Sequence, residues 1–285
     1  MEVVDNEFKL TQKQKEYASF YLHENEPSAT LKIQEIRKWI ESDDALFART
    51  DDFSIVRFLR SCKFDVEKTK IKLRNYYGQR RQSPEWYADR NPFLSDMQEM
   101  FNLGVFLPLK ELDEEGRMII LLRTSVHDPH KHTIENVVKA GMMILDIATR
   151  SNVSTSLHGV IGIFDMTGVT MSHGLQMTPS VIQKLVHSWQ GCYPLRIHSL
   201  NFINAPIYVN VVLNIFKKFM SKKLQSKVFI HMKSSKKWSN NLAIDLLPIE
   251  YGGNGGTLQE LIDYWKNIVE ENHDWFKEDE KYQSI

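Results

Sequence analysis

The first ninety residues place apolar and polar side chains at helical spacing. In the stretch "ATLKIQEIRKWIES" the following apolar residues fall near one helical face: Leu31, Ile33, Ile36, Trp39 and Ile40. The stretch "DFSIVRFLRSCKFDVEKTKIKLRNYYGQRR" predicts two helices that meet at Phe64, with Asp65 as the cap of the second helix. Pro84 and Pro92 mark a connecting stretch. We therefore predict a helical N-terminal domain over residues 1–92.

From residue 93 onward the pattern changes to short apolar runs separated by helical segments. "GVFLPL" and "RMIILLRT" read as strands joined by the turn "DEEG", and a helix is expected over 133–150. "GVIGIFD" is typical of a buried parallel strand, and "RIHSLNFIN" and "SKVFIH" predict two more strands. Thr178-Pro179 and the capping box Thr257-x-x-Glu260 mark helix starts. Residues 93–285 are therefore expected to form an α/β domain, a mostly parallel sheet flanked by helices.

One predicted helix is apolar over an unusually wide arc. In "APIYVNVVLNIFKKFMSKK" (205–223) the polar positions share one narrow sector, and the apolar positions cover roughly twice that arc. A surface helix needs an apolar stripe of only about 100°. The extra width indicates that this helix contacts something besides one layer of protein core.

The charge distribution adds a second feature. Basic and acidic residues number 36 each, yet the segment 166–244 contains no Asp or Glu. That segment holds ten basic residues, so the rest of the chain carries a net charge of −10. Such a segment favours an anionic partner, either a phosphate-rich membrane surface or a nucleic acid. Few of its aromatic residues are interleaved with exposed basic residues, which argues against nucleic acid.

No catalytic constellation is visible. The chain contains no GxSxG, GxxxxGK[ST] or strand-linked GxGxxG motif. "GGNGG" (252–256) is read as a turn, "HDPHKH" (127–132) as a solvated turn rather than a metal site, and Asp165 as a turn cap after a strand. We expect neither an enzyme nor a metal protein.

The remaining bulk features indicate a cytoplasmic protein. Cys62 and Cys192 lie far apart without metal spacing and are expected to be reduced thiols. The chain has no run of 18 apolar residues and no N-terminal apolar segment of a signal peptide. We expect transient, peripheral contact with membranes.

Four stretches in this order carry a family resemblance: "VRFLRSCKFDVEKTKIKLRNYY", "FDMTGVT", "YPLRIHSLNFINAP" and "LLPIEYGG". They cover about residues 30–265 and resemble the CRAL-TRIO lipid-binding family, in particular its alpha-tocopherol transfer protein and retinaldehyde-binding protein branch. The resemblance implies a CRAL-TRIO-N-like helical domain before the lipid-binding domain. It also implies that residues 205–221 form a mobile gate over a lipid cavity.

The resemblance and the helical stripe together assign candidate residues. The gate residues expected to touch lipid are Val209, Val212, Leu213, Phe216 and Met220. The expected cavity floor comprises Val138, Met142, Leu145, Val160, Leu185, Trp189, Tyr193, Ile197 and Leu200. Composition alone assigns each of these residues to the core, and that alternative remains open.

The resemblance further implies a phosphoinositide site beside the gate. Its expected residues are Arg196, Lys223, Lys227 and, as a substitute for an arginine of the family pattern, Lys63. The chain departs from the pattern at Cys62, which stands where that arginine is expected, and at Gln225, which replaces a position that is often basic.

The resulting functional hypothesis is a monomeric intracellular carrier without a cofactor. It would hold a tocopherol-, retinoid- or carotenoid-like lipid and exchange it at phosphoinositide-containing membranes. The alternatives are a phospholipid exchanger or lipid-sensing regulator and, less favoured, an enzyme that acts on a lipid.

Overall fold

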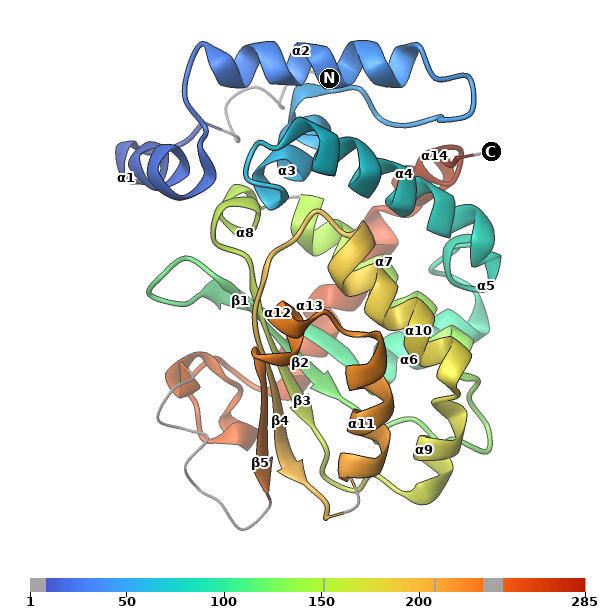
Figure 1. Ribbon diagram of the computed structural model, residues 1–285. Coiled ribbons are helices and arrows are strands. Elements are labelled where there is room, and N and C mark those ends of the chain that lie inside the picture. The colour runs from blue at the N-terminus through green and yellow to red at the C-terminus, as the bar shows by residue number, and fades with distance from the viewer. Residues whose placement is uncertain (1–8, 151, 208, 233–242, 285) are drawn as a thin grey trace.

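The first four helices of the chain form a layer above the sheet in Figure 1. The computed structural model describes residues 9–150, 152–207, 209–232 and 243–284. The N-terminal elements are α1 (Gln12–Tyr17), the π-helical turn η1 (Ala18–Leu22), α2 (Ser28–Glu41), α3 (Asp52–Ser61), α4 (Val66–Gln82), α5 (Pro84–Tyr87) and α6 (Ser95–Leu103). The Asp65 carboxylate accepts a hydrogen bond from the Lys68 N–H and caps α4, as predicted. Lys63 and Phe64 both have positive φ, 55° and 57°, and turn the chain between α3 and α4.

A five-stranded sheet confirms the predicted α/β fold class. Its strands are β1 (Phe106–Leu112), β2 (Met118–Arg123), β3 (Val160–Asp165), β4 (Ile197–Ala205) and β5 (Val228–Met232). They lie in chain order, with β1 antiparallel to β2 and every later pair parallel. Each strand therefore adds to the same edge of the growing sheet.

This strand order determines where the connecting helices lie. They are α7 (Ile134–Arg150), α8 (Val153–His158), α9 (Met171–Gln176), α10 (Pro179–His187), the π-helical turn η2 (Ser188–Cys192), α11 (Val209–Phe219) and α12 (Lys222–Gln225). Right-handed crossovers between strands that follow in one direction place their helices on the same face. Figure 1 shows α7, α9, α10 and α11 together on one side of the sheet.

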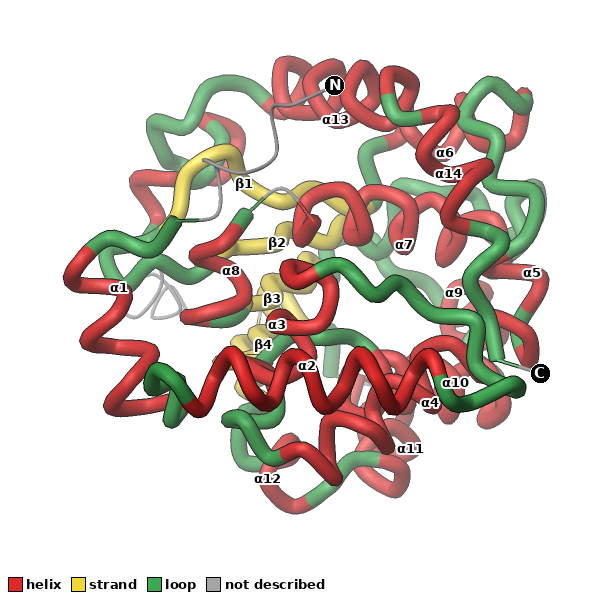
Figure 2. The backbone as a smooth tube through the Cα atoms, turned by 90° about the horizontal axis from the view of Figure 1, so that it is seen from above, coloured by secondary structure: helices red, strands yellow, loops and turns green. Residues whose placement is uncertain are grey.

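The C-terminal segment contains the turns η4 (Ile244–Leu246) and η5 (Ile249–Tyr251), followed by α13 (Leu258–Glu271) and α14 (His273–Asp279). The predicted capping box starts α13, because the Thr257 hydroxyl accepts from the Glu260 N–H and the Glu260 carboxylate accepts from the Thr257 N–H. The Trp265 indole donates to the Pro108 carbonyl of β1 at 2.6 Å. Viewed from above, α13 lies at the β1 end of the sheet and α11 and α12 lie at the other end (Figure 2).

A buried ion cluster ties the N-terminal helices to α7 and α14. The Arg90 guanidinium lies 2.9 Å from Asp146 and 3.0 Å from Asp279, and Arg80 lies 2.7 Å from Asp279. Burial alone raises the pKa of Asp279, but the charges of Arg80, Arg90 and Arg49 outweigh it and hold that pKa well below its usual range. One continuous apolar core spans both sides of residue 92, so the predicted domain boundary stays a prediction.

Candidate functional site: an apolar cavity beside a basic cleft

An apolar cavity of about 430 Å³ lies between the sheet and the helices that cover it. Helix α7 contributes a stripe at i, i+3, i+4 and i+7 spacing: Ile134, Val137, Val138, Gly141, Met142 and Leu145. The sheet contributes Phe106, Leu122, Phe164 and Phe202, near the carboxyl ends of the parallel strands. Such crevices are where open α/β sheets usually bind their ligands.

Helix α11 closes the cavity from the outside. Val209, Val212, Leu213 and Phe216 line it, and all except Val212 are fully buried. Val211, on the outer side of the same helix, is 67% exposed and still borders the cavity. The wide apolar arc of this helix thus has two uses, because part of it faces the cavity and part lies at the cavity rim.

The structure brings some of the predicted lining residues together and places others elsewhere. Val138, Met142, Leu145, Leu185, Trp189, Val209, Val212, Leu213 and Phe216 line the cavity. Val160, Tyr193, Ile197, Leu200 and Met220 do not, although they are buried or partly buried core residues. Val160 and Ile197 begin β3 and β4, at the opposite ends of the strands from the cavity. The Tyr193 ring instead packs edge-on against Tyr76, with centroids 5.4 Å apart.

Sequence reasoning missed Phe106, Phe164, Phe202, Met171 and His127 among the lining residues. Position along a strand was the signal that could have found the two phenylalanines of the parallel strands. Phe164 and Phe202 lie at or near the carboxyl ends of β3 and β4, where a ligand crevice is expected.

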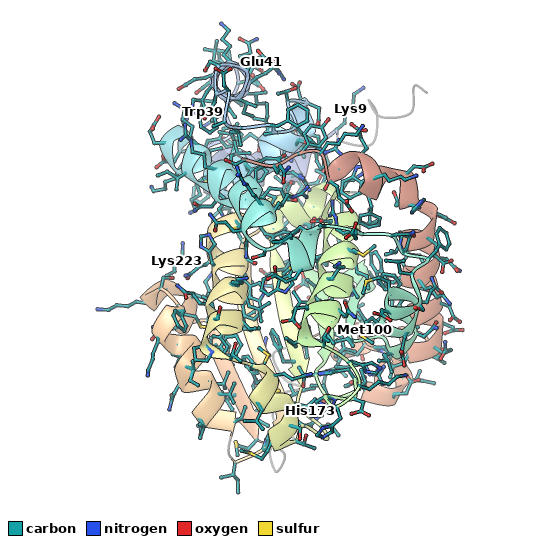
Figure 3. All side chains as sticks on the ribbon, turned by 90° about the vertical axis from the view of Figure 1, so that its right-hand side faces the viewer. Lys9, Trp39, Glu41, Met100, His173 and Lys223 are labelled. Carbon is teal, nitrogen blue, oxygen red and sulfur yellow. The ribbon has the colours of Figure 1, made fainter. Side chains whose placement is uncertain are left out.

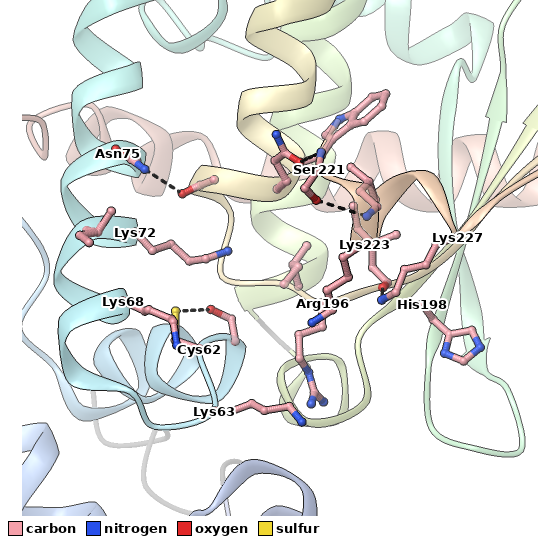
Figure 4. A pocket seen from close by; sticks show the side chains of 18 of the residues that line it. Cys62, Lys63, Lys68, Lys72, Asn75, Arg196, His198, Ser221, Lys223 and Lys227 are labelled. Carbon is pink, nitrogen blue, oxygen red and sulfur yellow. Dashed lines mark hydrogen bonds between the residues drawn. The ribbon is translucent and has the colours of Figure 1, made fainter. Parts of the chain in front are cut away.

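A basic cleft of about 720 Å³ lies between the N-terminal helices and α12. All four residues of the predicted phosphoinositide site line it: Lys63, Arg196, Lys223 and Lys227 (Figure 4). They come from the α3–α4 corner, from the residue before β4, from α12 and from the residue before β5. Lys68 and Lys72 of α4 also line the cleft, and their i, i+4 spacing on one helical face was a signal in the sequence.

The cleft is electropositive because five lysines and one arginine line it and no acidic side chain stands among its described lining residues, although Lys68 pairs with the nearby Asp65 at 2.6 Å. Burial lowers the pKa of Lys72 and Arg196. Burial also lowers the pKa of Lys227, and the charges of Lys223 and Arg196 lower it further. The Arg196 Nε and Nη2 atoms are buried without a hydrogen-bond partner. A bound anion would relieve this repulsion and supply the missing acceptors.

The structure shows the surroundings of both residues at which the chain departs from the expected pattern. Cys62 lines the cleft, and its Sγ lies 3.7 Å from the Ser61 hydroxyl. The Gln225 amide donates to the carbonyls of Lys217 and Met220, so it satisfies the end of α11 instead of facing an anion. Lys233, Lys236 and Lys237 of the acid-free segment lie outside the described residues.

Trp189 joins the two sites, because it lines both the cavity and the cleft. The adjacent Gln190 bonds to the C-terminal end of α11. Its amide donates to the Phe219 carbonyl at 3.0 Å and accepts from the Ser221 N–H at 3.0 Å. In Figure 3, Lys223 lies closer to the N-terminal helices and His173 lies at the opposite end. The cleft and the far end of the cavity are thus separated along the length of α11.

The Asp165 carboxylate holds the turn that follows β3. It accepts hydrogen bonds from the Thr167 N–H, the Asn204 amide and the Tyr251 hydroxyl. Burial raises the pKa of Asp165, but these donors and the Thr167 hydroxyl, 2.7 Å from the same carboxylate, outweigh that effect and lower the pKa overall. The predicted turn cap is therefore present, with Tyr251 as an additional donor.

The glycine-rich stretch makes a close backbone turn. A Cβ at Gly253 would lie 2.1 Å from the Leu247 carbonyl oxygen, so a side chain does not fit there. Within the described ranges, no three His, Cys, Asp or Glu residues come together as metal ligands, and Cys62 and Cys192 are free thiols. No helix in those ranges has the length and apolar character needed to cross a membrane.

The fold and the cavity define an α/β protein with an apolar ligand cavity at the carboxyl ends of its strands. The CRAL/TRIO domain model matches residues 102–253, which is more than half of the chain. The chain belongs to the CRAL/TRIO domain family, a family of lipid-binding and lipid-transfer proteins. A second model, the Pinta-like UBA domain, matches residues 25–97.

Two curated relatives are similar over most of the chain. The alpha-tocopherol transfer protein-like protein of Mus musculus is 28% identical over 227 residues, which cover 79% of this chain and 65%, just under two thirds, of that protein. Clavesin-2 of Homo sapiens is 26% identical over 239 residues, which cover 84% of this chain and 73% of that protein. The crystal structure of Sfh5 aligns with 89% of this chain and 92% of its own, at 14% identity and a TM-score of 0.49.

Proposed function

We propose that this protein carries one hydrophobic lipid, of tocopherol, retinoid or carotenoid type, and exchanges it at phosphoinositide-containing membranes. The observation that supports this proposal is the cavity that α11 closes, whose described lining contains no Asp, Glu, Lys or Arg. An apolar lipid gains about 0.8 kcal/mol for each CH₂ that it buries there. A largely apolar molecule can be buried against such a lining without leaving a charged group unpaired.

The cavity rim supports contact with a membrane. Met171, Leu175 and Val211 border the cavity and are 67%, 76% and 67% exposed. Ile207, just before α11, is 85% exposed. Exposed apolar side chains that gather around a cavity mouth are typical of interaction sites. We propose that this rim enters the bilayer surface when lipid exchanges.

The basic cleft supplies the second contact with the membrane. A lipid gains nearly the same free energy in a bilayer as in an apolar cavity, so smaller interactions decide when it leaves. Each Lys or Arg near an anionic membrane contributes about 1 kcal/mol. Binding of a phosphoinositide head group by Arg196, Lys223 and Lys227 would hold the gate against the membrane and favour its open state.

The second candidate function, phospholipid exchange, would require the cavity to hold a phosphate head group. No Lys or Arg side chain stands among the described residues that line it. Without one, a buried phosphate would remain unpaired at a large cost in free energy. The cavity therefore favours the carrier proposal.

Native mass spectrometry of the purified protein, followed by solvent extraction, tests the proposal. A single isoprenoid, retinoid or carotenoid near one-to-one stoichiometry is the expected result, either co-purified or after the lipid is offered. A phospholipid that these lipids cannot displace would favour the exchanger. A protein that takes up none of them would contradict a lipid-carrier function.

A further inference from the structure

Five side chains with a polar nitrogen or oxygen atom stand in the otherwise apolar lining of the cavity: Thr124, His127, Thr170, His173 and Trp189 with its indole N–H. The Thr124 hydroxyl donates to the Asp165 carbonyl at 2.7 Å. The Thr170 hydroxyl lies 2.7 Å from the His173 Nδ1, and the His173 Nε2 lies 3.1 Å from the His127 carbonyl oxygen. The hydroxyl groups of Thr124 and Thr170 and the ring nitrogens of His173 therefore already have hydrogen-bond partners within the protein.

His127 differs from these three. Its side chain is buried, with 5% of the residue exposed, and its Nδ1 has no hydrogen-bond partner. Its other nitrogen, Nε2, lies 2.9 Å from the Gln176 Oε1. His127 borders the cavity, and an unpartnered buried nitrogen in such a residue is costly unless a ligand that reaches it completes its hydrogen bond.

The neighbours of His127 determine which nitrogen carries the proton. The Gln176 amide nitrogen donates to two carbonyls, those of Pro129 at 3.1 Å and His132 at 2.7 Å. This orientation leaves the Gln176 Oε1 facing the imidazole, so the His127 Nε2 must be the donor of that bond. In the neutral ring the Nδ1 is then a bare acceptor. Burial, the largest influence on it, lowers the pKa of His127 and favours this neutral form.

We infer that the His127 Nδ1 accepts a hydrogen bond from the hydroxyl group of the bound lipid. The ligand class is therefore an apolar lipid whose polar end is an alcohol or a phenol. A lipid that ends in an aldehyde, an ester or an ether offers acceptors only and leaves the Nδ1 unpartnered. This inference rests on the proposed lipid-carrier function and adds to it the chemistry of the polar end.

Matched pairs of lipids test the inference on the unmodified protein. The first pair is all-trans-retinol and all-trans-retinal, and the second is α-tocopherol and its methyl ether. Delipidated protein is titrated with each lipid, and tryptophan fluorescence reports occupancy because Trp189 lines the cavity. We expect the hydroxyl-bearing member of at least one pair to bind about tenfold more tightly, since its partner strands a buried acceptor.

The variant H127F removes the acceptor, and H130F, at an exposed position three residues along, is the matched control. The ratio of the two dissociation constants, acceptor-only lipid over hydroxyl-bearing lipid, should fall to about one in H127F. It should stay near its wild-type value in H130F. Equal binding of alcohol and acceptor-only lipid by the wild type would overturn the inference while leaving the carrier function intact. A preference that persists in folded H127F would also overturn it. Binding of none of the four lipids would contradict the carrier function itself.

Discussion

The indole ring of Trp189 stacks on the phenyl ring of Phe216, with centroids 5.9 Å apart and planes inclined by only 9°. Trp189 belongs to η2 and borders both the cavity and the basic cleft, whereas Phe216 belongs to the helix that closes the cavity. The stack is therefore a contact that must break if α11 moves away from the sheet.

Truncation of this stack should destabilise the protein and loosen the gate. We expect Phe216→Ala to lower the free energy of unfolding by about 3 kcal/mol, because Phe→Ala in a core removes packing and leaves a void. Release of bound lipid should become faster. Urea unfolding and stopped-flow release measure the two effects. Phe229→Ala, at a side chain that is 48% exposed on β5, is the control and should cost less than about 1 kcal/mol.

Charge reversal in the cleft should slow lipid exchange at anionic membranes. We expect Lys223→Glu combined with Lys227→Glu to lower the transfer rate to phosphoinositide vesicles at least tenfold, because each cation contributes about 1 kcal/mol. Transfer to vesicles of neutral lipid should change little. The control, Lys38→Glu with Lys277→Glu, alters two exposed lysines outside the cleft. Equal effects of the two double variants would argue against a specific anion site.

The apolar rim should matter for exchange and not for affinity. Ile207 is 85% exposed and does not line the cavity, so Ile207→Asp should leave lipid affinity in solution unchanged. Vesicle-stimulated exchange should fall about tenfold, because inserting a charged aspartate into the bilayer surface costs more free energy than inserting an isoleucine. Leu31→Asp, at a 62% exposed position on α2, should leave exchange unaltered. A similar loss in both variants would show that the rim has no special role.

Removal of one carboxylate from the buried ion cluster should strongly destabilise the folded protein. Asp279→Asn leaves Arg80 and Arg90 with less compensation inside the protein, and such a break typically costs about 3 kcal/mol or more. Chemical denaturation should show a large fall in midpoint, whereas Asp44→Asn, at an exposed position, should shift it little. A midpoint equal to that of the wild type would mean that the cluster contributes no net stability.

Acidification should lower stability from about pH 6.5 downward. Burial lowers the pKa of His127, His158 and His187 in the folded state. As pH falls through about 6.5, the unfolded chain binds protons that the folded chain does not, so unfolding is favoured. Melting temperatures measured between pH 8 and pH 5.5 should decline over this range. His187→Gln should flatten the decline, and a profile that stays level in the wild type would contradict this prediction.

Local signals in the sequence correctly predicted most of the elements. Asp65, Thr178 and Thr257 each cap the helix that they were expected to begin. Capping depends on atoms within a few residues of each other, so it can be read from a short stretch. The apolar runs likewise located the strands. A strand that is buried on one face alternates apolar and polar residues, and a strand that is buried on both faces is apolar throughout.

Contacts between distant segments were harder to derive. Lys72 and Lys227 line one cleft although 155 positions separate them, and the packing of α4 against η2 helps to bring its two sides together. Leu200 and Phe202 lie on the same face of β4, yet only Phe202 reaches the cavity. The difference depends on how far along the strand the cavity begins, which the helices covering the sheet decide. Apolarity alone does not distinguish such residues from the rest of the core.

The cavity has a consequence for the amount of protein in a cell. Its walls are core side chains, so a lipid that fills it would complete the hydrophobic core and stabilise only the folded state. Ligand at about one hundred times its dissociation constant adds about 2.7 kcal/mol to the free energy of unfolding. Differences of this size alter how much of a marginally stable protein escapes degradation. A carrier built this way would accumulate when its cargo is plentiful and be cleared when the cargo is scarce, so that supply sets transport capacity without any change in gene expression.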